Sequence, residues 1–233
     1  MKHLLITSAL LMLVSNLAAA TEVQPVQFKA SYGVSKGNLA LGEVHRSLTA
    51  TDDGKYSFVS VTQPTGLAAA FIGRIEEHSL LAYHDHQIKP LHYEKSGDKK
   101  NNLNLLFDWE HALVKNNIEG NLWELPLSLG TQDLLSYQLA IMYDLQQGKT
   151  NLAYVLTDKH KFTSYQFQIL GEEKLDTPLG PMQTLKLQRI TDSADKTTII
   201  WCAPSLDYLP ARIEQNGFSM VIRSVEGFKS PAH

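Results

Sequence analysis

One segment, Thr131–Gln147 (TQDLLSYQLAIMYDLQQ), constrains the fold most, because it is the only long stretch after the first twenty residues whose apolar side chains recur at helical spacing. Thr131 and Asp133 suit the beginning of a helix, and Gly148 suits the position just past its end. The apolar positions are Leu134, Leu135, Leu139, Ile141, Met142 and Leu145. A single helix with one broad apolar face, set among strands, predicts packing against a curved sheet.

The remainder of the chain from Val26 onward consists of strand-like segments separated by turn signals. Asn216-Gly217 is the strongest two-residue hairpin signal, and Asp52–Lys55 is a second one. Pro64–Gly73 has no clear period and predicts a loop or one short helical turn. The pattern predicts a mainly β fold, namely an antiparallel, strongly curved sheet or half-open barrel of about 11–13 strands with one internal α-helix (131–147).

The first twenty residues have the pattern of a signal peptide. Lys2 supplies a positive charge, Leu4–Val14 is apolar, and Ala18–Ala20 gives a small-residue cleavage pattern. The apolar run is shorter than the roughly 20 residues that cross a membrane. We therefore expect a signal peptide at residues 1–20, a single β-rich domain at 21–233, a periplasmic location, and no transmembrane span after cleavage.

Charge and cysteine content narrow the expected partners. The chain has 21 Lys and Arg against 24 Asp and Glu, and loss of Lys2 with the signal peptide leaves a net charge of −4. This mild acidic balance, spread without blocks, argues against nucleic-acid binding and against steering to an anionic membrane surface. The one cysteine, Cys202, excludes an internal disulfide and an acylated cysteine at the cleavage point, so no lipid anchor is expected.

Three histidines form the best candidate for a metal-binding site. His84 and His86 would point to one side of a strand, and His92 could return beside them across a turn. The alternative is an exposed hairpin tip, where His and Asp are common for turn reasons. No cofactor is expected.

Catalytic motifs are absent from the sequence. Glu76 and Glu77 are neighbours on a predicted strand and point to opposite faces, so they cannot act together on one substrate. Neither a GxSxG nucleophile motif nor a glycine-rich phosphate loop occurs. An envelope hydrolase or metal-dependent enzyme is therefore the third choice among the functions considered.

The apolar loop LAAAFI, between Gly66 and Gly73, is the segment most indicative of function, because exposed apolar loops mark contacts with partners, ligands or membranes. Two interpretations remain open. The loop covers the concave face of the sheet, or it is a buried crossover between strands. In the first case, the residues contacting an apolar ligand would be Leu67, Phe71, Ile72, Leu139 and Met142.

Two further residues have both a functional and a structural interpretation. Trp201, with Arg212 stacked on an aromatic ring, would form a rim over the cavity or simply end a strand. Asp133 would orient a ligand at the helix N-terminus, or it would bind the free backbone N–H groups there. The structural interpretation is favoured for both.

Five stretches occur in a fixed order and spacing: FKASYGVSKGNLALGEVHRSL, IGRIEEHSL, LPLSLGTQDLLSYQLAI, EEKLDTPLGPMQTLKL and TTIIWCAPSLDYLPARIE. With these segments, the chain resembles the exported bacterial proteins of domain-of-unknown-function family 3108 over about Phe28 to Gly227. The resemblance implies a secreted, β-rich domain with one internal helix, similar in outline to the half-open barrels that carry lipoproteins across the periplasm. It implies no catalytic residue and no cofactor.

The leading functional hypothesis is a periplasmic protein that binds a lipid, another apolar ligand or an apolar peptide segment in a helix-lined concave sheet. The alternative is a non-enzymatic scaffold or interaction protein of the cell envelope, with a filled core and a protein partner docked outside. A continuous apolar cavity under Leu67–Ile72 would favour the first, and a filled interior the second.

Overall fold

The computed structural model describes residues 24–84, 87–97, 102–118, 120–158, 161–191 and 197–228, so the predicted signal peptide lies outside the described residues. The first eight strands are β1 (Phe28–Lys36), β2 (Leu39–Ala50), β3 (Tyr56–Pro64), β4 (Ile75–His84), β5 (Gln87–Ser96), β6 (Leu103–Asp108), β7 (Leu113–Asn116) and β8 (Trp123–Pro126). The others are β9 (Thr131–Gln132), β10 (Leu152–Asp158), β11 (Lys161–Thr177), β12 (Gly180–Ile190), β13 (Thr198–Ala203), β14 (Leu209–Gln215) and β15 (Phe218–Glu226). The helices are α1 (Ser136–Gln146) and the short 3-10 helices η1 (Gly66–Ala70) and η3 (Pro204–Leu206).

All the described strands belong to one sheet of 15 strands, in the order β8-β7-β6-β5-β4-β3-β2-β1-β15-β14-β13-β12-β11-β10-β9. The predicted mainly β fold with one α-helix is confirmed, and the strand number exceeds the expected 11–13 because β7, β8 and β9 are very short. The prediction of a wholly antiparallel sheet is wrong at one pair, since β9 runs parallel to β10.

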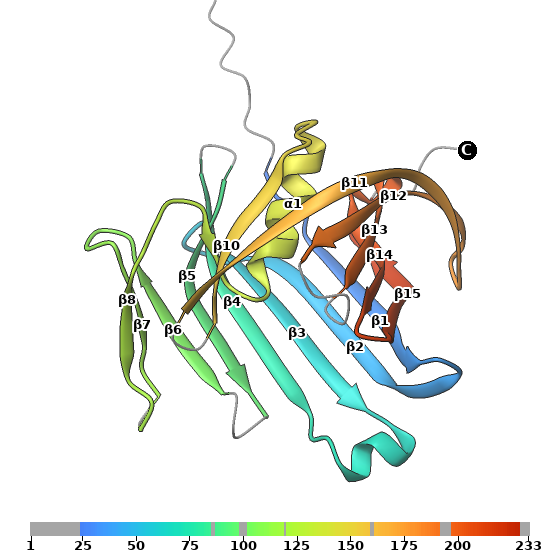
Figure 1. The fold of residues 1–233 in the computed structure, drawn as a ribbon, viewed down its shortest axis with the longest axis horizontal. Coiled ribbons are helices and arrows are strands. Elements are labelled where there is room, and N and C mark those ends of the chain that lie inside the picture. The colour runs from blue at the N-terminus through green and yellow to red at the C-terminus, as the bar shows by residue number, and fades with distance from the viewer. Residues whose placement is uncertain are drawn as a thin grey trace, which may run out of the picture.

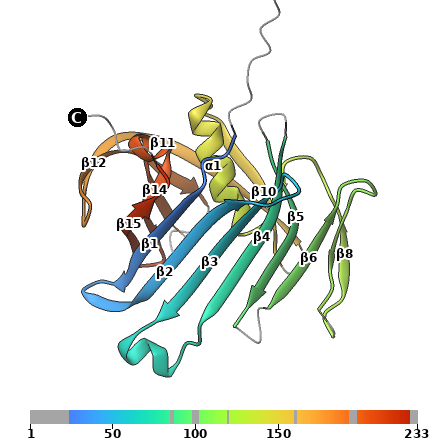
Figure 2. The ribbon, with the colours of Figure 1, turned by 180° about the vertical axis from the view of Figure 1, so that it is seen from behind.

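The sheet curls around α1 but is not closed by strand pairing (Figures 1 and 2). Its last strand, β9, comes back beside β5, where the Gln132 side chain donates a 2.8 Å hydrogen bond from Nε2 to the carbonyl oxygen of Ile88. Strands β6, β7 and β8 continue past this junction as a flap. The fold is thus a half-open barrel whose seam is joined by a side chain rather than by a ladder of backbone bonds.

The helix differs from the sequence prediction at its beginning and in its faces. Thr131 and Gln132 pair with Val155 and Leu156 as strand β9, and α1 begins only at Ser136. The expected single apolar face is also wrong, because the curled sheet encloses the helix and buries it on nearly every side. The buried helical residues are Ser136, Gln138, Leu139, Ala140, Ile141, Met142, Tyr143 and Leu145.

The C-terminal end of α1 is as predicted. Gly148 has a φ of +72° and donates its N–H to the carbonyl oxygen of Leu145 (3.0 Å), while the N–H of Lys149 bonds to that of Asp144 (2.9 Å). This pair of bonds is the Schellman motif, in which glycine adopts the left-handed conformation without steric cost.

The hydrophobic core fills the space between α1 and the inner face of the sheet. Its largest fully buried side chains are Tyr32, Leu48, Phe58, Leu81, Tyr93, Leu105, Leu135, Leu139, Ile141, Leu152, Leu156 and Leu187. Within the described residues, no helix is long and apolar enough to cross a membrane.

Candidate functional site

Tyr137, in the first turn of α1, packs against one wall of the barrel. Its ring lies edge-on to the ring of Tyr165 on β11, with centroids 5.7 Å apart and an interplanar angle of 72°. The guanidinium carbon of Arg189, on β12, lies 3.4 Å from the centroid of the Tyr165 ring. Arg189 is therefore held by stacking on an aromatic face.

The opposite wall supplies a second arginine. Arg46 on β2 donates a 2.6 Å hydrogen bond from Nη1 to Oε1 of Gln138, the residue that follows Tyr137. Its guanidinium carbon also lies 5.5 Å from the centroid of the Tyr32 ring. The two arginines thus approach the N-terminal turn of α1 from strands that are far apart in the sheet order.

One carboxylate accompanies the two arginines. Glu77, on β4, accepts a 2.6 Å hydrogen bond from the hydroxyl of Tyr93. Burial raises the pKa of Tyr137 to about 12, and the charges of Arg46, Glu77 and Arg189 also act on its hydroxyl. We call the set Arg46, Glu77, Tyr137, Tyr165 and Arg189 the arginine centre.

The arginine centre has unused hydrogen-bond donors. Among the described residues neither Arg46 nor Arg189 forms an ion pair, and the Nε atom of each is buried without a hydrogen-bond partner. A guanidinium carries five N–H donors, and the one hydrogen bond of Arg46 goes to a neutral amide. This arrangement suits a carboxylate or phosphate group, which accepts two parallel bonds from a guanidinium.

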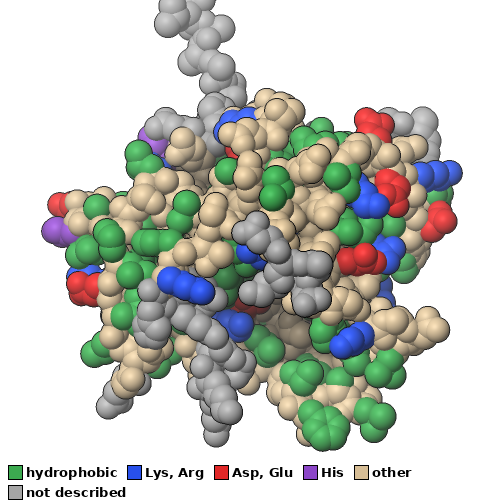
Figure 3. Space-filling model, viewed as in Figure 1, with side chains coloured by type: hydrophobic (Ala, Val, Ile, Leu, Met, Phe, Trp, Pro, Cys, Tyr) green, Lys and Arg blue, Asp and Glu red, His purple; other side chains and the backbone are tan. Residues whose placement is uncertain are grey.

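An apolar wall adjoins the arginine centre. Val34, Met220 and Ile213 are cross-strand neighbours on β1, β15 and β14, and all three are half-buried. Because side chains alternate along a strand, Val34 shares the inner face with Tyr32, the residue on which Arg46 packs. The middle of the face seen in Figure 3 is recessed between the grey segments, and basic and acidic side chains are visible there.

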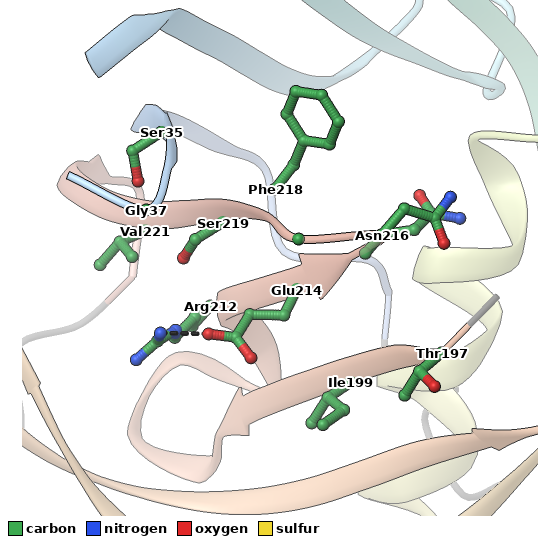
Figure 4. A pocket seen from close by; sticks show the side chains of 12 residues that line it. Ser35, Gly37, Thr197, Ile199, Arg212, Glu214, Asn216, Phe218, Ser219 and Val221 are labelled. Atoms are coloured by element: carbon green, nitrogen blue, oxygen red, sulfur yellow. Dashed lines mark hydrogen bonds and ion pairs between the residues drawn. The ribbon is translucent and has the colours of Figure 1, made fainter. Parts of the chain in front are cut away.

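A second concavity lies on the opposite face of the sheet. It is an open pocket of about 760 Å³ at the ends of β13, β14 and β15, into which Ile199, Arg212, Glu214 and Val221 project, while Phe218 points away (Figure 4). Arg212 pairs with Glu214 inside it. The positive charge of Arg212 is therefore already balanced by Glu214, whereas the two arginines of the arginine centre form no ion pair within the described residues.

Trp201 belongs to that outer face. It alternates with Ile200 and Cys202, which lie in the core, and its ring is 5.0 Å from the Lys186 ammonium and 5.1 Å from the Arg212 guanidinium. The predicted stacking of an arginine on Trp201 is present. Trp201 does not face the helix, because it is buried on the other side of the strand.

The structure does not bring the other predicted apolar site residues together. Leu139 and Met142 are buried in the core, whereas Leu67, Phe71 and Ile72 are exposed at an end of the sheet, on a loop that packs beside β2 and β3. Their predicted role in binding an apolar ligand remains a prediction, but they cannot form one contact surface as placed here.

The predicted histidine cluster is not assembled in the described residues. His92 lies opposite Leu80 in the pairing of β4 with β5, four residues away from His84, and its Nε2 is 3.0 Å from Oδ1 of Asn104. His86 lies outside the described residues. Within them, no group of three or more His, Cys, Asp or Glu side chains could hold a metal ion.

Asp133 has the structural role that the sequence favours. It is fully buried, and its Oδ1 accepts hydrogen bonds from the N–H groups of Leu135 (2.8 Å) and Ser136 (2.7 Å). Its own N–H donates to the Ser136 hydroxyl oxygen at 3.0 Å. These reciprocal bonds cap the first turn of α1.

Sequence reasoning missed the arginine centre, although most of its residues lie in the stretches that carry the family resemblance. GEVHRSL contains Arg46, IGRIEEHSL contains Glu77, and TQDLLSYQLAI contains Tyr137. A usable signal was Arg46 within an alternating strand, at a position that shares its face with apolar Val44 and Leu48. A charged residue on a buried face requires a partner or a ligand.

Comparisons with known proteins agree with this architecture. The family described as "Protein of unknown function (DUF3108)" matches residues 27–220, so the chain belongs to that family. No curated protein matches. Among solved structures, a β-barrel-like protein of domain of unknown function DUF1849 from Brucella abortus is similar, with a TM-score of 0.56 and 11% identity, over 89% of this chain and 100% of that one. At this identity the likeness concerns the fold alone.

Proposed function

We propose that the protein is a non-catalytic periplasmic binding protein for an anionic amphiphile, a molecule with one acidic group and an apolar chain. The observation that carries the proposal is the convergence of Arg46 and Arg189 on the first turn of α1, where neither arginine forms an ion pair within the described residues and the Nε atom of each has no hydrogen-bond partner. The acidic group would bind the two guanidiniums, and the chain would lie along the wall of Val34, Ile213 and Met220.

This proposal modifies the ligand expected from the sequence. The space between the helix and the sheet is filled by side chains such as Leu139 and Met142, which leaves no role there for a purely apolar ligand. The inner wall beyond the first turn of α1 combines charged, aromatic and apolar groups, as small-molecule sites commonly do. An amphiphile matches both parts of that wall.

The test uses cis-parinaric acid, a fluorescent fatty acid, and its uncharged methyl ester as paired probes. The wild-type chain should bind the acid more tightly than the ester. Arg46→Gln and Arg189→Gln should each weaken binding of the acid about tenfold, the loss expected for one charge-assisted bond, with little effect on the ester. Glu77→Gln should strengthen binding of the acid, because it removes a negative charge from the arginine centre.

The matched control is Arg212→Gln, which removes the arginine of the outer pocket and should leave binding of the acid unchanged. Equal affinity of the wild type for acid and ester, or an equal loss for Arg212→Gln and Arg46→Gln, would overturn the proposal. If the probe results match the expectation, organic extraction of the protein purified from periplasm, followed by mass spectrometry, would identify the natural amphiphile.

A second candidate function is supported by the filled core. An envelope scaffold needs a rigid body and an outer docking surface rather than a cavity, and the helix packed inside the barrel meets the first requirement. Absence of binding to either probe, in a chain that folds cooperatively, would favour this function.

A further inference from the structure

The β3–β4 loop contains an exposed apolar segment that is not part of the arginine centre. No residue of η1 is buried, and the exposed fractions of Leu67, Phe71 and Ile72 are 78%, 88% and 47%. Between Gly66 and Gly73 no side chain carries a polar atom. Exposure of this apolar surface to water is unfavourable, so its persistence in the fold points to a contact.

Backbone N–H groups at the ends of this loop have partners within the protein. The N–H of Thr65 donates to the carbonyl oxygen of Leu41 (2.8 Å), and those of Phe71 and Ile72 both donate to that of Ala68 (3.1 and 2.9 Å). Donors that are already satisfied can enter a medium without water, whereas unsatisfied donors would oppose such a transfer.

Other exposed apolar residues lie at the same end of the sheet. Strand pairing places Leu39 opposite Lys36, and Lys36 opposite Phe218, with the Lys36 ammonium 4.9 Å from the centroid of the Phe218 ring. The loop projects from this end in Figure 1, and apolar side chains gather there in Figure 3. We call the set of exposed side chains the apolar rim; it comprises Leu39, Leu67, Phe71, Ile72 and Phe218.

Charge is distributed unevenly between the two ends of the strands. Among the described residues, the turns at the apolar rim carry Lys36, Arg74 and Lys161, while Glu76 pairs with Arg74 and Asp158 lies opposite Lys161 in the strand pairing. The turns and strand ends at the opposite end carry Lys29 and Lys55 against the acids Asp52, Asp53, Asp108, Glu110, Asp207 and Glu226. Among these described residues, the apolar end therefore has three basic and two acidic residues, whereas the opposite end has two basic and six acidic ones, so the net negative charge lies away from the apolar rim.

We infer that the apolar rim docks on an anionic lipid bilayer, with Leu67, Phe71 and Ile72 among the acyl chains and Lys36 and Arg74 near the headgroups. A protein interface needs about one hydrogen bond per 100–200 Å² to fix a partner. The side chains from Gly66 to Gly73 contain no hydrogen-bond donor or acceptor, so they cannot form such bonds with a protein partner. A bilayer requires only apolar area and basic charge, and the rim has both.

The test measures flotation of the mature chain with vesicles of phosphatidylglycerol and phosphatidylethanolamine, compared with vesicles of phosphatidylcholine alone. The wild type should float with the anionic vesicles and much less with the neutral ones. Phe71→Asp should lower the partition coefficient at least tenfold. Its thermal unfolding should be unchanged, because the side chain has almost no contacts to lose.

Leu129→Asp is the matched control. Leu129 is exposed to the same degree as Phe71, at 85%, but it lies on the β8–β9 connection away from the rim. This variant should float like the wild type. A wild type that stays with the soluble fraction, or a Leu129→Asp variant that loses as much binding as Phe71→Asp, would overturn the inference. Neither result depends on the amphiphile site, which the parinaric acid assay tests separately.

Discussion

The hydroxyl of Ser79, on β4, donates a 2.6 Å hydrogen bond to Oδ2 of Asp133, the residue that caps helix α1. Both side chains are completely buried. The single carboxylate therefore links the central sheet to the first turn of the helix. Tyr137 of the arginine centre and Gln138, which binds Arg46, lie just beyond Asp133, so their positions depend on this link.

Asp133 should make the stability of the protein depend on pH in an unusual direction. Burial raises its pKa to about 6, above the ordinary value of 3.8 that it regains on unfolding. The contribution of Asp133 to the free energy of unfolding is therefore fully present below pH 4, where the carboxyl is protonated in both states, and is lost as the pH rises through 6. Two pKa units correspond to roughly 3 kcal/mol for a fully buried group.

The variant Asp133→Asn tests whether the ionisation of Asp133 causes this pH dependence of stability. Its amide oxygen can keep the bonds to the N–H groups of Leu135 and Ser136, but it cannot ionise. Urea unfolding at a series of pH values should show the difference in stability between variant and wild type increasing in favour of the variant from pH 4 to pH 6. A difference that does not change over this range would show that Asp133 ionises normally.

Leu139→Ala should destabilise the protein by about 2–5 kcal/mol, because this side chain is completely buried and its removal leaves a cavity. Met142→Leu, which conserves volume in the same helix, should cost under about 1.5 kcal/mol. Leu67→Ala, in the exposed loop, should change stability by less than about 0.5 kcal/mol. A small loss for Leu139→Ala in urea unfolding would contradict the packed interior described here.

Local features of the fold could be predicted from the sequence where neighbouring residues determine them. Asn216 and Gly217 have φ values of +53° and +78°, as their hairpin turn requires, and Gly148 ends the helix as expected. Thr131 and Gln132 could not be assigned correctly. Their pairing with β10 depends on how the sheet curls, and this long-range contact overrides the local helical pattern.

The arginine centre could not be predicted from the sequence either, because it also depends on long-range contacts. Arg46 and Arg189 lie in the first and last thirds of the chain, and nothing in their local sequence relates them. They meet at Tyr137 only because the sheet wraps around the helix. The apolar loop, in contrast, was identifiable because its composition alone conflicts with exposure to water.

Cys202 should be inert in the folded protein. It is completely buried, and burial raises the pKa of its thiol far above the usual range, so the reactive thiolate is not formed. A thiol reagent such as 5,5′-dithiobis(2-nitrobenzoic acid) should label the native chain only as fast as the chain unfolds. In urea it should label the single thiol at once, and rapid native labelling would contradict the burial of β13.

Gly97→Ala should be among the most damaging single changes outside the core. Gly97 has a φ of +96°, and an added Cβ would lie 1.9 Å from the carbonyl oxygen of Arg74, at the base of the β3–β4 loop. Because the obstacle is backbone, the loop must move or the strand end must open. The strained φ alone costs about 1–2 kcal/mol, and the displacement adds to it.

Gly130→Ala separates these two costs, because Gly130 has a similar φ of +79° but open space where the Cβ would be. It should lower the free energy of unfolding by only about 1–2 kcal/mol, and Gly97→Ala should lower it by clearly more. Gly97→Ala should also weaken flotation with anionic vesicles, since it moves the loop that carries Leu67 and Phe71, whereas Gly130→Ala should not. Equal effects of the two substitutions would mean that Gly97 does not fix the position of the loop.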